Sequence, residues 1–190
     1  MNNKIFHVYH SDLRDPNVFD TLSQNAYDNY SIITEASLID VAGQKEVVIT
    51  KNDSGWMFTL PSSQKVLSDS VTFDNSVFFV GFSPDNNAAA TCNAGQGTNF
   101  LYRVSVINGD PVVNNLDALD PDDADDARRK TLAQGGIAPT PTILFPSPDD
   151  PSCTGAECSP PPIGCVGVEC FDPDFDNNPV RTLWTQDGIM

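Results

Sequence analysis

The cysteines near the C-terminus are the residues whose spacing most clearly suggests chemistry. They form two copies of one pattern, offset by twelve residues: Cys153-TGAE-Cys158 and Cys165-VGVE-Cys170. Each copy has a glycine, Gly155 or Gly167, at a position where a tight ring favours positive φ. Each also has a glutamate directly before its second cysteine. The repeat therefore predicts two small closed loops.

Two kinds of chemistry fit these cysteines. Zinc sites usually place paired cysteines two to four residues apart, so these pairs lie at the edge of that range. Disulfides are the favoured interpretation, provided that the compartment is oxidising. Four cysteines allow three pairings, and the extended geometry expected of Pro160-Pro161-Pro162 holds the two loops apart and predicts local pairing. Cys92 is then an odd thiol or pairs with a cysteine outside this chain.

An acidic run is the second candidate for chemistry. Residues 116–130 read LDALDPDDADDARRK and contain six aspartates, at positions 117, 120, 122, 123, 125 and 126. Calcium is one interpretation, but the run has neither the central glycine nor the closing glutamate of an EF-hand loop. We therefore expect an exposed, solvated loop, or a short helix with an acidic start and a basic end.

The sequence offers little support for an enzyme. It contains no phosphate-binding glycine loop, dinucleotide fingerprint or nucleophile elbow. His7 lies in an expected strand over residues 4–9 and His10 directly follows it. Strand positions three apart point to opposite faces, so the two cannot chelate one ion together. The 26 acidic residues against 10 basic ones give a net charge of -16, which disfavours nucleic acid as a partner. We expect a non-catalytic chain that does not bind nucleic acid and has no membrane span.

The stretch 55–110 is expected to organise the fold. Its runs 71–73 and 77–80 are β-branched or aromatic, and Asp74-Asn75 between them is typical of a hairpin turn. Alternation from Phe100 to Ile107 predicts a third strand that ends at Asn108-Gly109. The run 56–60, stopped by Pro61, is expected to be the fourth strand of the same antiparallel sheet.

This pattern predicts an all-β fold built from the antiparallel blades of a partial β-propeller, quinoprotein-like, with a long Pro- and Cys-rich loop. The 15 prolines and 12 glycines agree with many turns and little helix. Residues 31–56 are left open between two strands and a short helix. The residues expected to be buried are Trp56, Phe73, Val77, Phe79, Tyr102, Val104 and Ile143.

Several segments, in this order, resemble the C-terminal propeller of the PilC/PilY family, the tip-associated adhesins and assembly factors of bacterial type IV pili. They are GWMFTLP, KVLSDSVTFDNSVFFVGFSPDN, TNFLYRVSVINGD, RRKTLAQGGIAPTPTILFP and VRTLWTQ. The resemblance covers residues 50–145 well and the last dozen residues more weakly. It implies that residues 1–190 are the C-terminal part of such a propeller, with residues 146–179 as a disulfide-bearing loop insertion.

The resemblance also implies a function. Members of the family act in pilus assembly, adhesion and twitching motility, with pilins or minor pilins and host or abiotic surfaces as partners. It implies an exported protein at the cell surface, pilus tip or outer membrane, with a signal peptide upstream of this chain. The alternative is a fragment of a quinoprotein-like propeller enzyme or of an envelope-assembly scaffold.

The family further implies a calcium loop with alternating acidic residues. Here oxygen ligands alternate only in the segment 172–178, so the candidate calcium ligands are Asp172, Asp174, Asp176 and Asn178. Side chains at alternate loop positions can converge on a hard cation. The pattern departs from the family at Val180, where an acidic ligand is expected, and Pro173 and Pro179 stiffen the loop. The family's calcium loop is therefore alternatively expected upstream of Met1.

Overall fold

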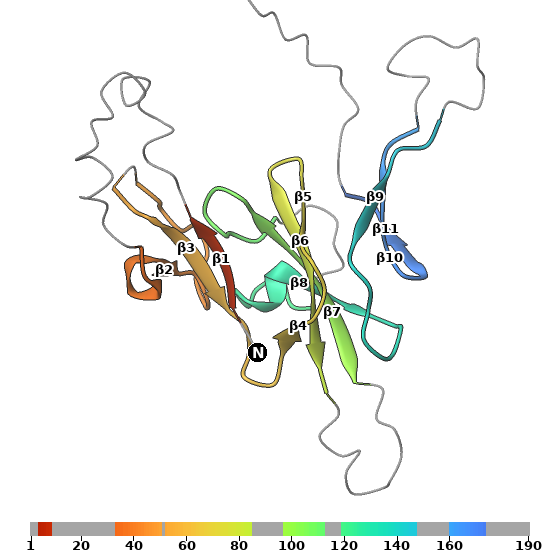
Figure 1. Cartoon of the computed structure of the whole chain (residues 1–190), viewed down its shortest axis with the longest axis horizontal. Coiled ribbons are helices and arrows are strands. Elements are labelled where there is room, and N and C mark those ends of the chain that lie inside the picture. Colours follow the sequence, from red (N-terminus) through yellow and green to blue (C-terminus); the bar gives the residue numbers. More distant parts are fainter. Residues whose placement is uncertain are drawn as a thin grey trace, which may run out of the picture.

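The computed structural model describes residues 4–8, 33–50, 52–84, 97–112, 119–147 and 160–173, with backbone only for 6–8. These residues form three β-sheets (Figure 1). The two short helices among them are 3-10 turns, η2 (Glu35–Ser37) and η3 (Asp126–Arg128). The prediction of an all-β chain with little helix is confirmed for these residues.

The first sheet has the order β1-β3-β2. Its strands are β1 (Lys4–Val8), β2 (Ile39–Asp40) and β3 (Gly55–Thr59). β1 runs antiparallel to β3, whereas β2 runs parallel to it. The described part of the segment that the sequence left open, residues 31–56, thus contains η2, the short strand β2 and the start of β3.

The central sheet is an antiparallel meander. Its strands are β4 (Lys65–Val66), β5 (Val71–Phe73), β6 (Ser76–Ser83), β7 (Thr98–Ser105) and β8 (Arg129–Leu132). β4 and β5 pair with opposite ends of β6, and β7 lies between β6 and β8. Asp74 and Asn75 both have positive φ, so the predicted hairpin turn between β5 and β6 is confirmed.

The third sheet has the order β11-β10-β9 and is antiparallel throughout. Its strands are β9 (Thr142–Leu144), β10 (Ile163–Val166) and β11 (Glu169–Phe171). In the ribbon view β9, β10 and β11 lie on the opposite side of the central sheet from β1, β2 and β3 (Figure 1).

The prediction that residues 56–60 complete the central sheet is wrong. β3 pairs with β1 and β2, and the fourth strand of the meander is β8. Trp56, Phe58 and Leu60 pack instead on the face of β6 and β7. A period-two apolar pattern shows that one face of a strand is buried, but it does not distinguish pairing within a sheet from stacking upon it.

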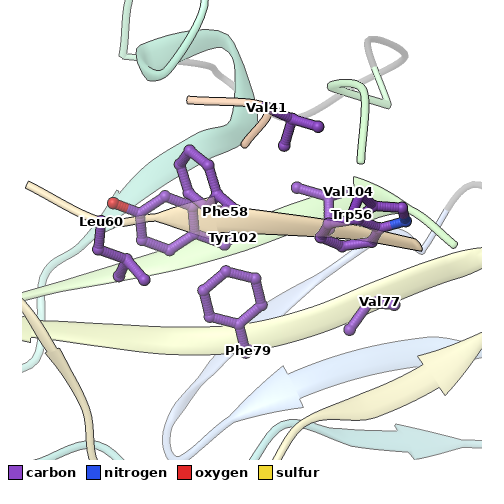
Figure 2. Close-up of a cluster of buried hydrophobic side chains, with 8 residues drawn as sticks. All are labelled: Val41, Trp56, Phe58, Leu60, Val77, Phe79, Tyr102 and Val104. Carbon is purple, nitrogen blue, oxygen red and sulfur yellow. The ribbon is translucent and has the colours of Figure 1, made fainter. Parts of the chain in front are cut away.

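Both faces of the central sheet are buried. One face contributes alternate residues of β6 and β7 to a core with the first sheet (Figure 2): Val41, Trp56, Phe58, Leu60, Val77, Phe79, Tyr102 and Val104. The other face contributes to a smaller core with the third sheet and the chain before it: Val80, Leu101, Leu132, Ala138 and Val166. Of the residues expected to be buried, Phe73 and Ile143 are only half-buried, because β5 and β9 each pair with one neighbour in the described residues.

Candidate functional site

The acidic run forms a compact loop that ends in η3. The Asp123 carboxylate accepts the backbone N–H groups of Asp126 and Asp125, both at 2.9 Å. These two hydrogen bonds hold the pKa of Asp123 below its ordinary value. Asp120 accepts the N–H of Asp122 in the same way, at 2.9 Å. These aspartates therefore shape the loop by capping its own backbone, as aspartate does in turns.

Two residues, Gly43 and Lys45, anchor this loop beside the first sheet through three hydrogen bonds. The Lys45 ammonium donates to the carbonyl oxygens of Pro121 and Asp122 at 2.6 and 2.9 Å. The Gly43 N–H donates to a carboxylate oxygen of Asp125 at 2.7 Å. An acidic loop between β7 and β8 is thus fixed to the segment that follows β2.

Arg128 is the centre of this arrangement and is completely buried. Its guanidinium donates to three backbone carbonyls: Gly109 at 2.9 Å, Ala124 at 2.7 Å and Gln44 at 2.6 Å. It also forms an ion pair with Asp125 and lies 5.2 Å from the centre of the Phe58 ring. Burial lowers the pKa of Arg128, and the negative charge of Asp125 acts in the opposite direction.

Arg129, the next residue, makes similar contacts with side chains of the central sheet. Arg129 forms an ion pair with Asp126 and lies 4.6 Å from the centre of the Phe100 ring. It also donates to the Tyr102 hydroxyl at 3.5 Å, and that hydroxyl donates to Gln64 at 2.6 Å. Burial raises the pKa of Tyr102 to about 12, with the charge of Arg129 opposing the shift.

The run ends in a short helix with an acidic start and a basic end, one of the two expected forms, but the expectation that the run is solvated is wrong for Arg128. Desolvating an arginine is costly unless its donors are paired, and the carbonyl groups gathered by the loop supply those partners. The contacts join the first sheet, the 108–110 turn and β8. The acidic loop between β7 and β8 therefore connects two sheets, and we call it the connector loop. Within the described ranges, no cluster of three or more His, Cys, Asp or Glu side chains is arranged to hold a metal ion.

The predicted calcium ligands are not assembled in the part of the chain that the structure covers. Asp172 is exposed immediately after β11. Asp174, Asp176 and Asn178 lie outside the described residues, so the calcium prediction stays a prediction.

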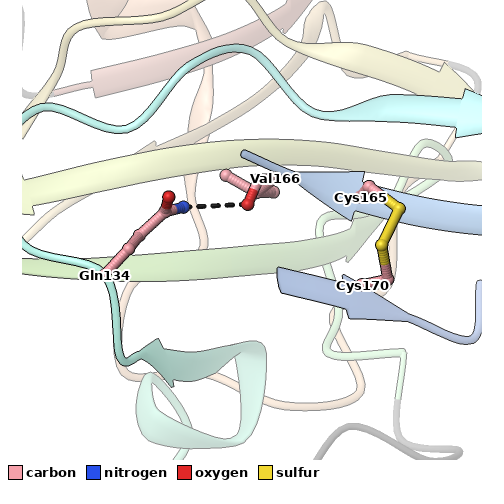
Figure 3. The surroundings of a disulfide bond; sticks show 4 residues. All are labelled: Gln134, Cys165, Val166 and Cys170. Atoms are coloured by element: carbon pink, nitrogen blue, oxygen red, sulfur yellow. Dashed lines mark hydrogen bonds between the residues drawn. A yellow bond between two sulfur atoms is a disulfide. The ribbon is translucent and has the colours of Figure 1, made fainter. Parts of the chain in front are cut away.

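The structure joins Cys165 to Cys170 by a disulfide, one of the two predicted local pairs (Figure 3). The two residues face each other across β10 and β11, and Gly167 in the turn between them has a φ of 58°. Cys92, Cys153 and Cys158 lie outside the described residues, and their pairing stays a prediction.

Gln134 is a residue whose role the sequence did not indicate. Its side-chain amide donates to the carbonyl of Val166 at 2.9 Å (Figure 3), and its backbone N–H donates to the Glu169 carboxylate at 2.8 Å. It thus binds both strands of the β10–β11 hairpin. The only local signal for Arg128 was its place at the basic end of the acidic run, and nothing in the sequence singled out Gln134.

No known protein family, curated protein or solved structure matches this chain. Among the described residues, none of the helices has the length and apolar character needed to cross a bilayer. The stacked sheets, the connector loop and the hairpin disulfide are the features that bear on function.

Proposed function

We propose that this chain is part of a non-catalytic surface protein of the type IV pilus-tip kind, acting in pilus assembly, adhesion and twitching motility. The observation that carries the proposal is the stacking of two small sheets on the two faces of a five-stranded antiparallel sheet. Consecutive blades of a propeller pack face to face in this manner. The segments that resemble the PilC/PilY family contribute β3 to β9 of this arrangement.

Two further features support the proposal. The Cys165–Cys170 disulfide suits an exported protein, because such bonds persist in oxidising compartments. The buried arginine of the connector loop has every guanidinium nitrogen hydrogen-bonded to the protein. That role is structural, as expected of a scaffold that presents surfaces to pilins or minor pilins.

The test is deletion of the encoding gene in its bacterium, followed by counts of surface pili and measurement of twitching. The deletion strain should lose surface pili and twitching, and the wild-type gene should restore both. A complementing gene with Trp56→Ala should fail if the first core is required, whereas Ile107→Ala, at an exposed position, should restore piliation. Normal piliation in the deletion strain would refute the proposal, and quinone-dependent oxidation by the purified protein would favour the enzymatic alternative.

Calcium binding is a separate part of the proposal, and Asp172, Asp174, Asp176 and Asn178 are its proposed ligands. Isothermal titration of the full chain with calcium should give sub-millimolar binding that is lost in Asp174→Ala. The absence of any heat in millimolar calcium would remove this site without affecting the pilus proposal.

A further inference from the structure

We propose that the Cys165–Cys170 disulfide is a redox-sensitive clasp that holds the β10–β11 hairpin against the central sheet. The two cysteines are directly opposite residues of the hairpin, in the middle of its three paired positions. Cys170 is exposed and Cys165 is half-buried. The bond is therefore within reach of a thiol reagent while it constrains the short segment that forms the middle strand and one edge strand of the third sheet.

This hairpin covers part of the smaller core, which lies on the face of the central sheet away from the first sheet. Val166 is completely buried against Val80 and Leu101 of the central sheet. The Phe171 ring lies on Gly164, where an added Cβ would be 2.3 Å from the ring, and its centre is 5.4 Å from that of Phe78. Release of the hairpin would consequently expose an apolar face of β6 and β7.

Besides the disulfide and the apolar contacts, the hairpin is held by pairing of β10 with β9 over three residue pairs. Gln134 supplies two hydrogen bonds, to Val166 and Glu169, and Val168 at the tip of the hairpin is exposed. A two-stranded hairpin is marginal in water by itself, so this one depends on β9, on the central sheet and on its own disulfide. The disulfide closes a covalent ring, which lowers the number of conformations open to the hairpin when it is released. This favours the state in which the hairpin is docked on the central sheet.

The switching step is a thiol–disulfide exchange with a dithiol reductant. A thiolate of the dithiol attacks the sulfur of Cys170, forms a mixed disulfide and displaces Cys165 as a thiolate, which takes up a proton. The second thiolate of the reductant then attacks its own mixed-disulfide sulfur and releases Cys170, which is also protonated. The protein disulfide gains two electrons and two protons, and the dithiol becomes a cyclic disulfide.

Hydrogen exchange on the full chain, oxidised and after treatment with dithiothreitol, tests the proposal. We expect amides of residues 163–171 to exchange on the order of tenfold to a hundredfold faster after reduction, because a ring of this size restricts the open state by that order. Amides of β3, in the first sheet, should not change. Reoxidation of the same sample should restore protection, which makes the measurement independent of whether a cysteine variant folds.

Variants separate this bond from the other cysteines. Cys165→Ser/Cys170→Ser should reproduce the faster exchange without reductant, whereas Cys153→Ser/Cys158→Ser, the matched pair in the sequence repeat, should leave the hairpin protected. Unchanged hairpin exchange after reduction would overturn the proposal. So would loss of protection in β3 as well, since the bond would then support the whole fold, or an equal effect of the matched pair.

Discussion

The two faces of the central sheet are covered in different ways. On one face, aromatic and aliphatic side chains from residues 41–60, which include β3, pack on β6 and β7 and form the larger core. In it the centres of the Phe79 and Tyr102 rings are 4.8 Å apart, and the rings stack. On the other face, the smaller core is supplemented by the Gln134 hydrogen bonds and the Cys165–Cys170 disulfide. The larger core therefore depends mainly on apolar packing, whereas the smaller core also depends on a disulfide and two hydrogen bonds.

The difference shows how a small sheet compensates for limited apolar area. Burial of large side chains stabilises the first interface through the hydrophobic effect. The third sheet has short strands, and Leu144 and Ile163 on its outer face are exposed, so fewer apolar groups are removed from water. The covalent link takes a larger share there, and it responds to reductant as apolar contacts do not.

The largest expected effect is on the first face. Trp56→Ala should lower the free energy of unfolding by about 3–5 kcal/mol, because it leaves a cavity among fully buried neighbours and frees the Val106 carbonyl that the indole N–H binds at 3.0 Å. Urea unfolding followed by tyrosine and far-ultraviolet signals measures it. Ile107→Ala, on an exposed side chain, is the control and should stay within about 0.5 kcal/mol of the wild type.

Arg128 tests whether the first face also depends on a buried cation. Arg128→Ala should cost about 3 kcal/mol, because three backbone carbonyls lose their donors in a buried site. Arg128→Lys should recover only part of that loss, since an ammonium cannot reproduce the planar fork. Equal stability of Arg128→Ala and the wild type would show that the connector loop does not stabilise the interface. The same urea titration measures both variants.

The buried hydroxyl of Tyr102 makes the first face sensitive to alkaline pH. Burial raises its pKa from 10.0 to about 12, so the unfolded chain loses this proton before the folded one does. The contribution of this shift to the free energy of unfolding is complete below pH 10. It falls by about 2 kcal/mol as the pH rises towards 12. Urea unfolding between pH 9 and 12 should show this fall relative to Tyr102→Phe. Parallel pH profiles for the two proteins would contradict it.

The smallest effect concerns the second face. Gly164→Ala places a methyl group 2.3 Å from the Phe171 ring, which must shift, and we expect a loss of about 1 kcal/mol. The loss should shrink when the same change is made in a Phe171→Ala background, because the clash is then removed. Thermal unfolding of the four proteins in this cycle measures the coupling. An undiminished loss in the double variant would point to backbone strain instead.

Local pattern predicted much of the central sheet. β-Branched and aromatic runs and the Asp74-Asn75 turn located β5, β6 and β7, because strand propensity and hairpin turns act between residues close in the chain. The same reasoning placed Trp56, Phe79 and Tyr102 in the core. The repeated cysteine spacing indicated the Cys165–Cys170 pair for the same reason.

The sequence by itself determined the all-β class, the hairpin, the alternating core positions and the local disulfide, since each depends on near neighbours. Only the tertiary structure decided that β3 stacks on the central sheet, that β8 completes it, and that Arg128 is buried. These outcomes depend on contacts between residues far apart in the chain, such as Arg128 with Gln44. A charged residue at the end of an acidic run is usually solvated. Its burial is favourable here because the carbonyl oxygens of Gln44 and Gly109 join that of the nearby Ala124 around its guanidinium.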